Sequence, residues 1–307
     1  MSNKLDFNNK LFGLDSHFNN LVNLYNSDIF PKVTLFSGKK GIGKYTLILH
    51  FLTYVLDKEN YDINNKEVDQ KSIFTTQLIN SLCQNIIILK KNTTIKIDDI
   101  RLLKKKLLTQ PLNNKPRFII LDEVELYNIN SLNALLKILE EPSKNNYFIL
   151  INNQEKNLLD TIRSRSIETK VYIKNSERIQ IANSLIKQNQ IEPVIDFIDT
   201  NISPGTFLIY NNICSDNNIN IDSNFITKIQ ILLKLYKKSK NILFIKSSIF
   251  FTEHHFYKIS LIKKDKLDML INMKTDIIKN LNDLVTYNLN LNLVLNSILT
   301  YFNYAKE

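Results

Sequence analysis

Three of the chain's five glycines, Gly38, Gly41 and Gly43, fall within six consecutive positions directly before Lys44. Their spacing matches the phosphate-binding pattern Gly-x-x-x-x-Gly-Lys-Ser/Thr up to its last position. Glycines there allow the positive φ that turns backbone N–H groups inward, and the lysine adds charge for phosphate oxygens. Tyr45 stands where the pattern has a hydroxyl that binds Mg²⁺. We therefore predict a phosphate loop without its metal ligand, the alternative being a plain strand-to-helix turn.

Two further groups of polar residues each follow an apolar run. Asp122 and Glu123 come directly after residues 118–121, and Asn152 follows residues 147–151. An acidic pair at a strand end can hold Mg²⁺ through water and polarise an attacking water, and an amide there could contact a γ-phosphate. The first site has the Walker B arrangement. A capped strand end and a turn formed by two asparagines are the alternatives.

The elements that would position these groups alternate along the chain. Residues 33–36 read as a buried strand and 46–52 as an apolar helix, with a polar surface loop over 57–70. A strand at 85–89 and a helix from Ile97 follow, and the helix that begins at Ser131 ends before Pro142. Alternating strands and helices predict an α/β fold with a parallel sheet.

Composition limits the remaining possibilities. The 307 residues carry a formal net charge of +10, with a pI of about 9.3, which suits contact with nucleic-acid phosphates but also fits ordinary lysine-rich helix faces. Absence of a long apolar stretch or signal-peptide core leads us to expect a cytoplasmic protein with no membrane contact. Cys83 and Cys214 lie far apart, and the adjacent His254 and His255 point apart on a helix. We therefore expect no disulfide, no zinc and no other metal site.

A longer motif points to a known family. The sequence from Asn133 to Pro142 reads Asn-Ala-Leu-Leu-Lys-x-Leu-Glu-Glu-Pro and is followed by Ser-Arg-Ser at 164–166. With the Asp-Glu strand before it, it resembles the bacterial DNA polymerase III clamp loader, an AAA+ assembly, over residues 11–171. Within that family the incomplete phosphate loop is similar to the delta-prime subunit more than to the ATP-hydrolysing tau/gamma subunit.

The resemblance implies roles for individual residues. Arg165 would be an arginine finger that reaches the ATP of a neighbouring subunit, although Ser166 replaces the cysteine of the family's Ser-Arg-Cys signature. The sensor arginine of hydrolysing subunits is missing from residues 203–207. The family's four-cysteine zinc module is reduced to Cys83 alone. ATP, with Mg²⁺, could still bind through the loop and Asp122–Glu123 without being hydrolysed.

The resemblance also implies an architecture and partners. We expect an AAA+ P-loop domain at 1–170, a small helical lid at 171–215, capped by Asn175 or Ser176, and a helical collar at 216–307. The apolar residues at helical spacing in 225–281 are consistent with that collar. The partners implied are the delta and tau/gamma subunits in a pentameric ring and, through the complex, the sliding clamp and primer-template DNA.

Three other functions stay open at this point. A tau/gamma-like subunit would hydrolyse ATP despite Tyr45. An unrelated P-loop nucleotide or nucleoside kinase would need a substrate lid motif, which the sequence lacks. A stand-alone DNA-binding protein would bind DNA without partners, with a steep salt dependence.

Overall fold

The structure is a computed structural model that describes residues 8–89, 95–109, 115–195, 197–198, 200–220 and 223–304. Its contacts divide the chain into two compact units. The first is Met1–Asn189 with Ser203–Thr206, and the second is Gln190–Ile202 with Phe207–Glu307. The division into three domains with boundaries near 170 and 215 stays a prediction.

The first unit is built on a five-stranded parallel sheet, which confirms the predicted α/β fold. The strand order is β4-β5-β6-β1-β7. In chain order the strands are β1 (Val33–Ser37), β4 (Ile86–Leu89), β5 (Arg117–Leu121), β6 (Asn146–Asn152) and β7 (Ile167–Lys170). Because all strands run the same way, the loops after β1, β5 and β6 meet at one edge of the sheet.

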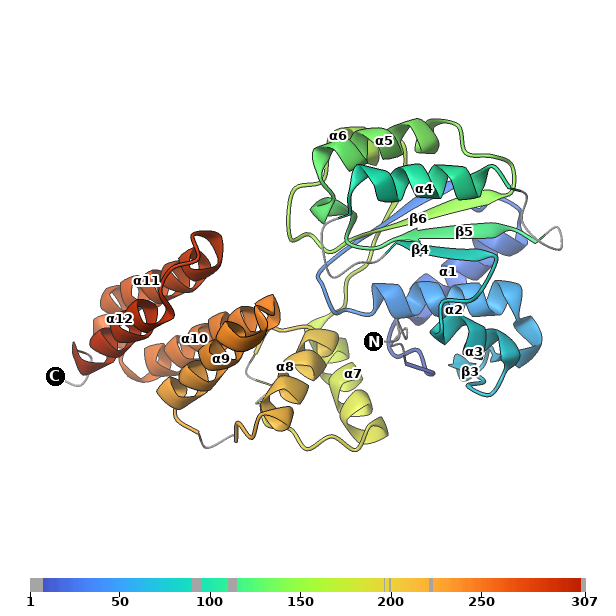
Figure 1. The fold of residues 1–307 in the computed structure, drawn as a ribbon. Helices are drawn as coiled ribbons and strands as arrows, with labels where there is room; N and C mark the ends of the chain where they lie inside the picture. Colours follow the sequence, from blue (N-terminus) through green and yellow to red (C-terminus); the bar gives the residue numbers. More distant parts are fainter. Residues whose placement is uncertain are drawn as a thin grey trace. The chain divides into compact units, whose positions relative to one another are not determined.

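Helices cover both faces of the sheet (Figure 1). One face packs against α1 (Asp15–Asn26), α2 (Lys44–Leu56) and α3 (Ile73–Ile79). The other packs against α4 (Ile97–Leu107), α5 (Ile129–Glu140) and α6 (Asp160–Arg163). Neighbouring residues of β5 serve opposite faces, since Phe118 joins the first core and Ile119 the second. Burial on both faces explains why the strands read as continuous apolar runs.

The prediction of a surface loop at 57–70 is wrong in part. The segment contains a short 3₁₀ helix (Lys58–Asn60) and a small antiparallel hairpin of β2 (Tyr61–Asp62) and β3 (Glu67–Val68). Residues before the first helix dock on this hairpin. The Val68 N–H donates to Asn9 O at 2.8 Å, and the Leu11 N–H donates to Lys66 O at 3.0 Å. Buried Tyr61 and Val68 anchor the hairpin to the core. Because these two residues are seven positions apart in the sequence, they do not form the alternating apolar pattern that predicts a strand.

After the sheet, helix α7 (Asn175–Gln188) completes the larger segment of the first unit. Its N-cap is Lys174, one residue before the predicted Asn175 or Ser176, and the Lys174 N–H donates to Glu177 Oε2 at 2.8 Å. Helix α8 (Pro204–Asp216) begins within the short segment Ser203–Thr206, which also belongs to the first unit.

The second unit is helical, as predicted. It contains α9 (Phe225–Ser239), α10 (Ile242–Ile262), α11 (Leu267–Thr286) and α12 (Leu291–Tyr304), and each successive pair is in contact. Of the apolar residues at helical spacing in 225–281, Ile229 and Leu232 are buried, whereas Leu267 and Ile271 are each 45% exposed. Within the described part of the chain, no helix is long and apolar enough to cross a membrane.

Candidate functional site: a phosphate loop and its surroundings

The glycine-rich segment forms the predicted loop between β1 and α2. Gly41 and Gly43 have φ values of 78° and 95°, and Gly43 is the residue that caps the helix. The first N–H groups of α2 and the helix dipole favour an anion at this point. The loop therefore has the backbone geometry of a phosphate site, at the place where the sequence predicted one.

The Lys44 side chain is folded back on the loop. Its Nζ donates to Gly38 O at 2.6 Å and to Lys39 O at 2.8 Å, and the residue is only 3% exposed. Burial lowers the pKa of Lys44 to about 8, although the charges of Glu125 and Asp122 act to raise it. In this conformation the ammonium therefore donates its hydrogen bonds to carbonyl oxygens of the loop itself.

Tyr45 does not supply a metal ligand of the usual kind. Its ring packs against the core beneath α2. Burial, followed by the charge of Asp122, raises the pKa of its phenol far above the ordinary value, so the group is a neutral phenol near a carboxylate. The loop geometry fits a phosphate group, but the residue after Lys44 does not fit the Mg²⁺ that accompanies ATP in hydrolysing P-loop proteins.

The loop after β5 brings three carboxylates to this edge of the sheet. Asp122 is buried, and Glu123 has a φ of 54°, just before a 3₁₀ turn at Val124–Leu126. Glu125, which sequence reasoning missed, is 5% exposed. Its Oε1 accepts the Asn153 N–H at 2.9 Å, and its Oε2 has no hydrogen-bond partner among the described residues. Burial raises the pKa of Glu125, against the backbone N–H groups that stabilise its ionised form.

Lys40 is a second residue that sequence reasoning missed. Its Nζ donates to Glu123 Oε1 and lies 3.4 Å from Glu155 Oε1. Burial acts to lower the pKa of Lys40, but the hydrogen bonds and charges of Glu123 and Glu155 outweigh it, so the pKa is raised. One ammonium therefore joins the phosphate loop to the loops after β5 and β6. The only signal in the sequence was a second lysine within the glycine pattern.

Asn152 lies where it was predicted, at the end of β6 and opposite Ser37 of β1. Its Nδ2 donates to Ser37 Oγ at 3.4 Å, its Oδ1 accepts the Gln154 N–H at 2.8 Å, and its carbonyl oxygen accepts the Gly38 N–H at 3.2 Å. The amide holds the start of the phosphate loop beside the end of β6. Whether it also senses a γ-phosphate stays a prediction.

Residues Ser203–Thr206, part of the stretch 203–207 that lacks the sensor arginine, lie directly against the phosphate loop. Ser203 Oγ donates to Lys40 O at 2.6 Å, and the Gly205 N–H donates to Gly41 O at 2.8 Å. A Cβ on Gly41 would come within 2.3 Å of Ser203 Oγ. Gly41 is therefore required both for its positive φ and for this close approach.

Arg165 follows α6, and its polar contacts with described residues are to α5 and α6. Nε and Nη2 donate to Glu140 Oε1 at 3.0 Å and 2.6 Å, and Nη1 donates to Thr161 O at 3.1 Å. The side chain is one-third exposed. Three of the five N–H groups of the guanidinium are used, which leaves two for a ligand from outside.

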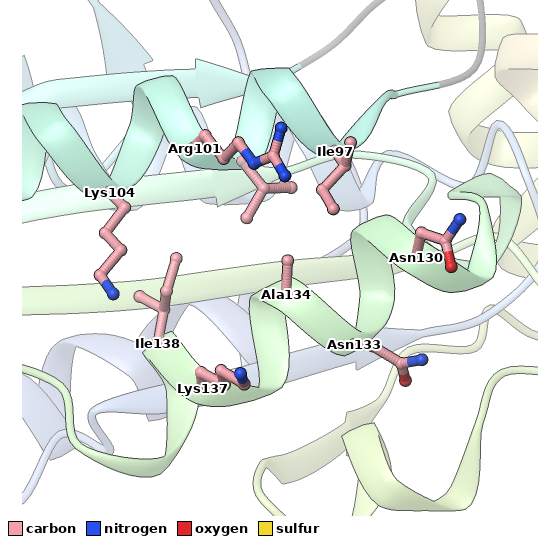
Figure 2. A pocket seen from close by; sticks show the side chains of 9 residues that line it. Ile97, Arg101, Lys104, Asn130, Asn133, Ala134, Lys137 and Ile138 are labelled. Atoms are coloured by element: carbon pink, nitrogen blue, oxygen red, sulfur yellow. The ribbon is translucent and has the colours of Figure 1, made fainter.

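A basic groove of about 380 Å³ lies between α4 and α5 (Figure 2). Arg101 and Lys104 project from α4, and Lys137 projects from α5. The remaining lining residues are apolar or carry amides, and none is acidic: Ile97, Ile100, Asn130, Asn133, Ala134 and Ile138. Positive charge and amide donors around one groove suit a chain of phosphate groups.

Comparison with known proteins agrees with this geometry. Residues 13–177, more than half of the chain, match the family described as "DNA polymerase III, delta subunit". The chain belongs to this clamp-loader family. Its AAA+ fold, the phosphate loop and the Asp122–Glu123 strand end all lie within the matched segment.

Curated members of the clamp loader are similar over part of their length. The DNA polymerase III subunit gamma of Buchnera aphidicola subsp. Acyrthosiphon pisum (strain APS) is 30% identical over 145 residues, which cover 47% of this chain and 39% of that protein. The subunit delta' of Buchnera aphidicola subsp. Schizaphis graminum (strain Sg) is 29% identical over 130 residues, 38% of this chain and 40% of that one. The chain thus spans about two fifths of these relatives.

Among solved structures, a DNA polymerase III gamma subunit-related protein from Thermotoga maritima matches 92% of this chain and 98% of its own, with 15% identity and a TM-score of 0.47.

For the described residues, no group of three or more histidine, cysteine, aspartate or glutamate side chains is placed to hold a metal ion. Cys83 and Cys214 are both buried free thiols.

Proposed function

We propose that this chain is a delta-prime-like subunit of the clamp loader, which helps ATP-driven loading of the sliding clamp onto primed DNA without hydrolysing ATP itself. The observation that carries the proposal is Tyr45. Tyr45 is the second residue of α2, and its partly buried phenol stands where a hydrolysing subunit needs a small hydroxyl on Mg²⁺. Partners would be the delta and tau/gamma subunits, the clamp and primer-template DNA.

In this role Arg165 acts in trans on the ATP of a neighbouring subunit. Its position just after α6 supports that assignment, because the guanidinium is partly exposed and two of its N–H groups have no hydrogen-bond acceptor among the described residues. Such arginines stabilise charge on the transferred phosphoryl group and contribute roughly 10³–10⁵ in rate.

The test is ATP hydrolysis by a loader reconstituted with the other subunits and primed DNA. Arg165→Ala should reduce turnover by at least roughly 10²-fold while size-exclusion chromatography still gives the full complex. Arg163→Ala is a matched control, because Arg163 ends the same short helix. Unchanged turnover with Arg165→Ala would remove the trans role.

A tau/gamma-like ATPase is the second candidate, and the intact Asp122–Glu123 pair favours it. Hydrolysis of ATP by the isolated chain, abolished by Lys44→Ala, would establish this function in place of the first. Binding of labelled ATP should be scored separately from hydrolysis, because the delta-prime-like role allows the one without the other.

DNA contact within the loader is supported by the groove between α4 and α5. Replacing Lys104 and Lys137 together by alanine should weaken DNA binding of the assembled loader and reduce the salt slope of binding by about 2. Lys237→Ala with Lys238→Ala, on α9, removes equal charge elsewhere and should leave the slope unchanged. If both double substitutions reduced the salt slope equally, DNA binding would depend on the net charge of the protein and not on the groove.

A further inference from the structure

Lys40 occupies an unusual place in a phosphate loop, because its side chain reaches across the edge of the sheet. The loop itself follows β1, while the two carboxylates that the ammonium meets come from the loops after β5 and β6. The three side chains are each partly shielded, with exposed fractions of 39% for Lys40, 24% for Glu123 and 25% for Glu155.

In a hydrolysing P-loop protein, a divalent cation binds at this edge of the sheet. Mg²⁺ takes the hydroxyl after the loop lysine and an acidic residue at a strand end. Here Tyr45 stands at the position of that hydroxyl, and Glu123, the second of the two acidic residues at the strand end, is already paired with an amine of the same chain. Both changes remove a reason for Mg²⁺ to bind, and they affect different parts of the site.

We propose that Lys40 is a built-in cation that replaces Mg²⁺ as the counter-charge of Glu123 and Glu155. The ammonium holds the three loops together with no ligand present and engages the carboxylate that would otherwise polarise an attacking water. The inference extends the proposed non-hydrolysing role to the use of metal by this site. It depends on the geometry of Lys40 and not on the role of Arg165.

Neighbouring contacts fix the two carboxylates where Lys40 meets them. Glu123 directly precedes the 3₁₀ turn at Val124–Leu126, and its carbonyl oxygen accepts the Leu126 N–H at 2.9 Å, which ties its backbone to that turn. The loop that contains Glu155 is anchored by Glu125, which accepts the Asn153 N–H. Removing the ammonium would therefore leave two carboxylates close together, which is a costly arrangement that a new cation can relieve.

The experiment measures thermal unfolding of the isolated full chain with Mg²⁺ alone as the probe. Lys40→Met keeps the length of the side chain and removes its charge, and Lys39→Met removes the neighbouring exposed charge of the same loop. Each protein is melted in EDTA and in about 10 mM MgCl₂, a concentration high enough to populate a weak Mg²⁺ site made of one or two carboxylates and water, with NaCl matching the ionic strength.

We expect the wild type and Lys39→Met to melt at the same temperature with and without Mg²⁺. Lys40→Met should melt roughly 2–4 °C lower in EDTA, and Mg²⁺ should recover most of that loss. Adding Glu123→Gln to Lys40→Met should restore the melting temperature and abolish the response to Mg²⁺, because the carboxylates no longer repel.

Three results would overturn the proposal. Stabilisation of the wild type by Mg²⁺ as large as that of Lys40→Met would mean that the metal is not replaced. A Lys40→Met protein as stable as Lys39→Met would mean that Lys40 does not hold the site together. A loss in Lys40→Met that Mg²⁺ does not recover would mean that the amine does not act as a cation substitute. None of these results bears on ATP turnover in the Arg165→Ala loader, so the two proposals fail separately.

Discussion

Arg165 and Glu140 form a two-pronged ion pair in which Nε and Nη2 both donate to the single oxygen Oε1 of Glu140. Glu140 is the last residue of α5, within the Leu-Glu-Glu-Pro motif, and Arg165 follows α6. The contact links the motif that identified the family to the residue proposed to act in trans. In this structure the pair holds the guanidinium against the end of α5.

Glu140→Gln should lower ATP turnover of the assembled loader, because the guanidinium loses the charge that orients it. Exposed ion pairs contribute about 0.5–1 kcal/mol, which corresponds to a roughly two- to fivefold fall in kcat. The apparent KM for ATP should not change. Glu141→Gln, at the adjacent exposed position, is the control and should behave as wild type. A KM effect in place of a kcat effect would contradict the orienting role.

Lys44→Ala should have little effect on turnover by the loader, since the proposed hydrolysis takes place in neighbouring subunits. We expect a change of less than roughly threefold, under about 1 kcal/mol in the transition-state free energy. Steady-state ATPase assays of reconstituted complexes measure it directly, with Arg165→Ala in parallel. A fall as large as that of Arg165→Ala would show that this chain's own loop takes part in hydrolysis.

Gly41→Ala should destabilise the first unit even if the loop never binds a ligand. The residue has a φ of 78°, and an added Cβ would come within 2.3 Å of Ser203 Oγ and 2.7 Å of Thr206 Oγ1. We expect a loss of about 1–3 kcal/mol in the free energy of unfolding, measured by urea denaturation. Combining Gly41→Ala with Ser203→Ala removes one of the clashes and should recover part of the loss. Additive losses from the two changes would contradict the close approach.

His50 should make stability depend on pH. The buried imidazole has Nε2 2.9 Å from Asn8 O and Nδ1 3.2 Å from Tyr61 Oη, a pairing that suits the neutral ring. Burial lowers its pKa to about 4 from 6.5, against the opposing effect of the Asn8 hydrogen bond. The unfolded chain then binds the proton more readily, so the stability contributed by the neutral ring is lost as pH falls below about 6.5.

The expected loss from this residue between pH 7.5 and pH 5 is about 2 kcal/mol in the free energy of unfolding. Urea denaturation at the two pH values measures it, and His50→Gln should remove that share of the pH dependence. His17→Gln is the comparison, because His17 lies at the start of α1 and is less buried. Equal pH dependence in wild type and His50→Gln would assign the effect to other groups.

The parts of the fold that the sequence revealed are those with a local signal. Apolar runs marked β1, β5 and β6, and the glycine spacing marked the loop before Lys44. Strand β7 gave no such signal, because it is an edge strand whose residues Ile167 and Glu168 are exposed. Contacts between residues far apart in the chain could not be predicted from the sequence.

Lys40 and Glu155 are 115 positions apart, and Glu140 and Arg165 are 25 apart. No periodicity connects such pairs, since only the closing of the sheet brings their loops together. Glu125 was missed for a related reason. A glutamate four residues beyond a strand usually faces water, and only the turn of the chain at Val124–Leu126 buries it.

The strand-like docking of residues 8–11 on the β2–β3 hairpin has a practical consequence. Asn8 contacts His50, Asn9 pairs with Val68, and Leu11 pairs with Lys66. A protease that cut the chain between Leu11 and Gly13 would release this segment and remove the Asn8 carbonyl oxygen that lies 2.9 Å from Nε2 of the buried His50 imidazole. Resistance of that short stretch to limited digestion would thus report on the integrity of a hairpin some fifty residues away.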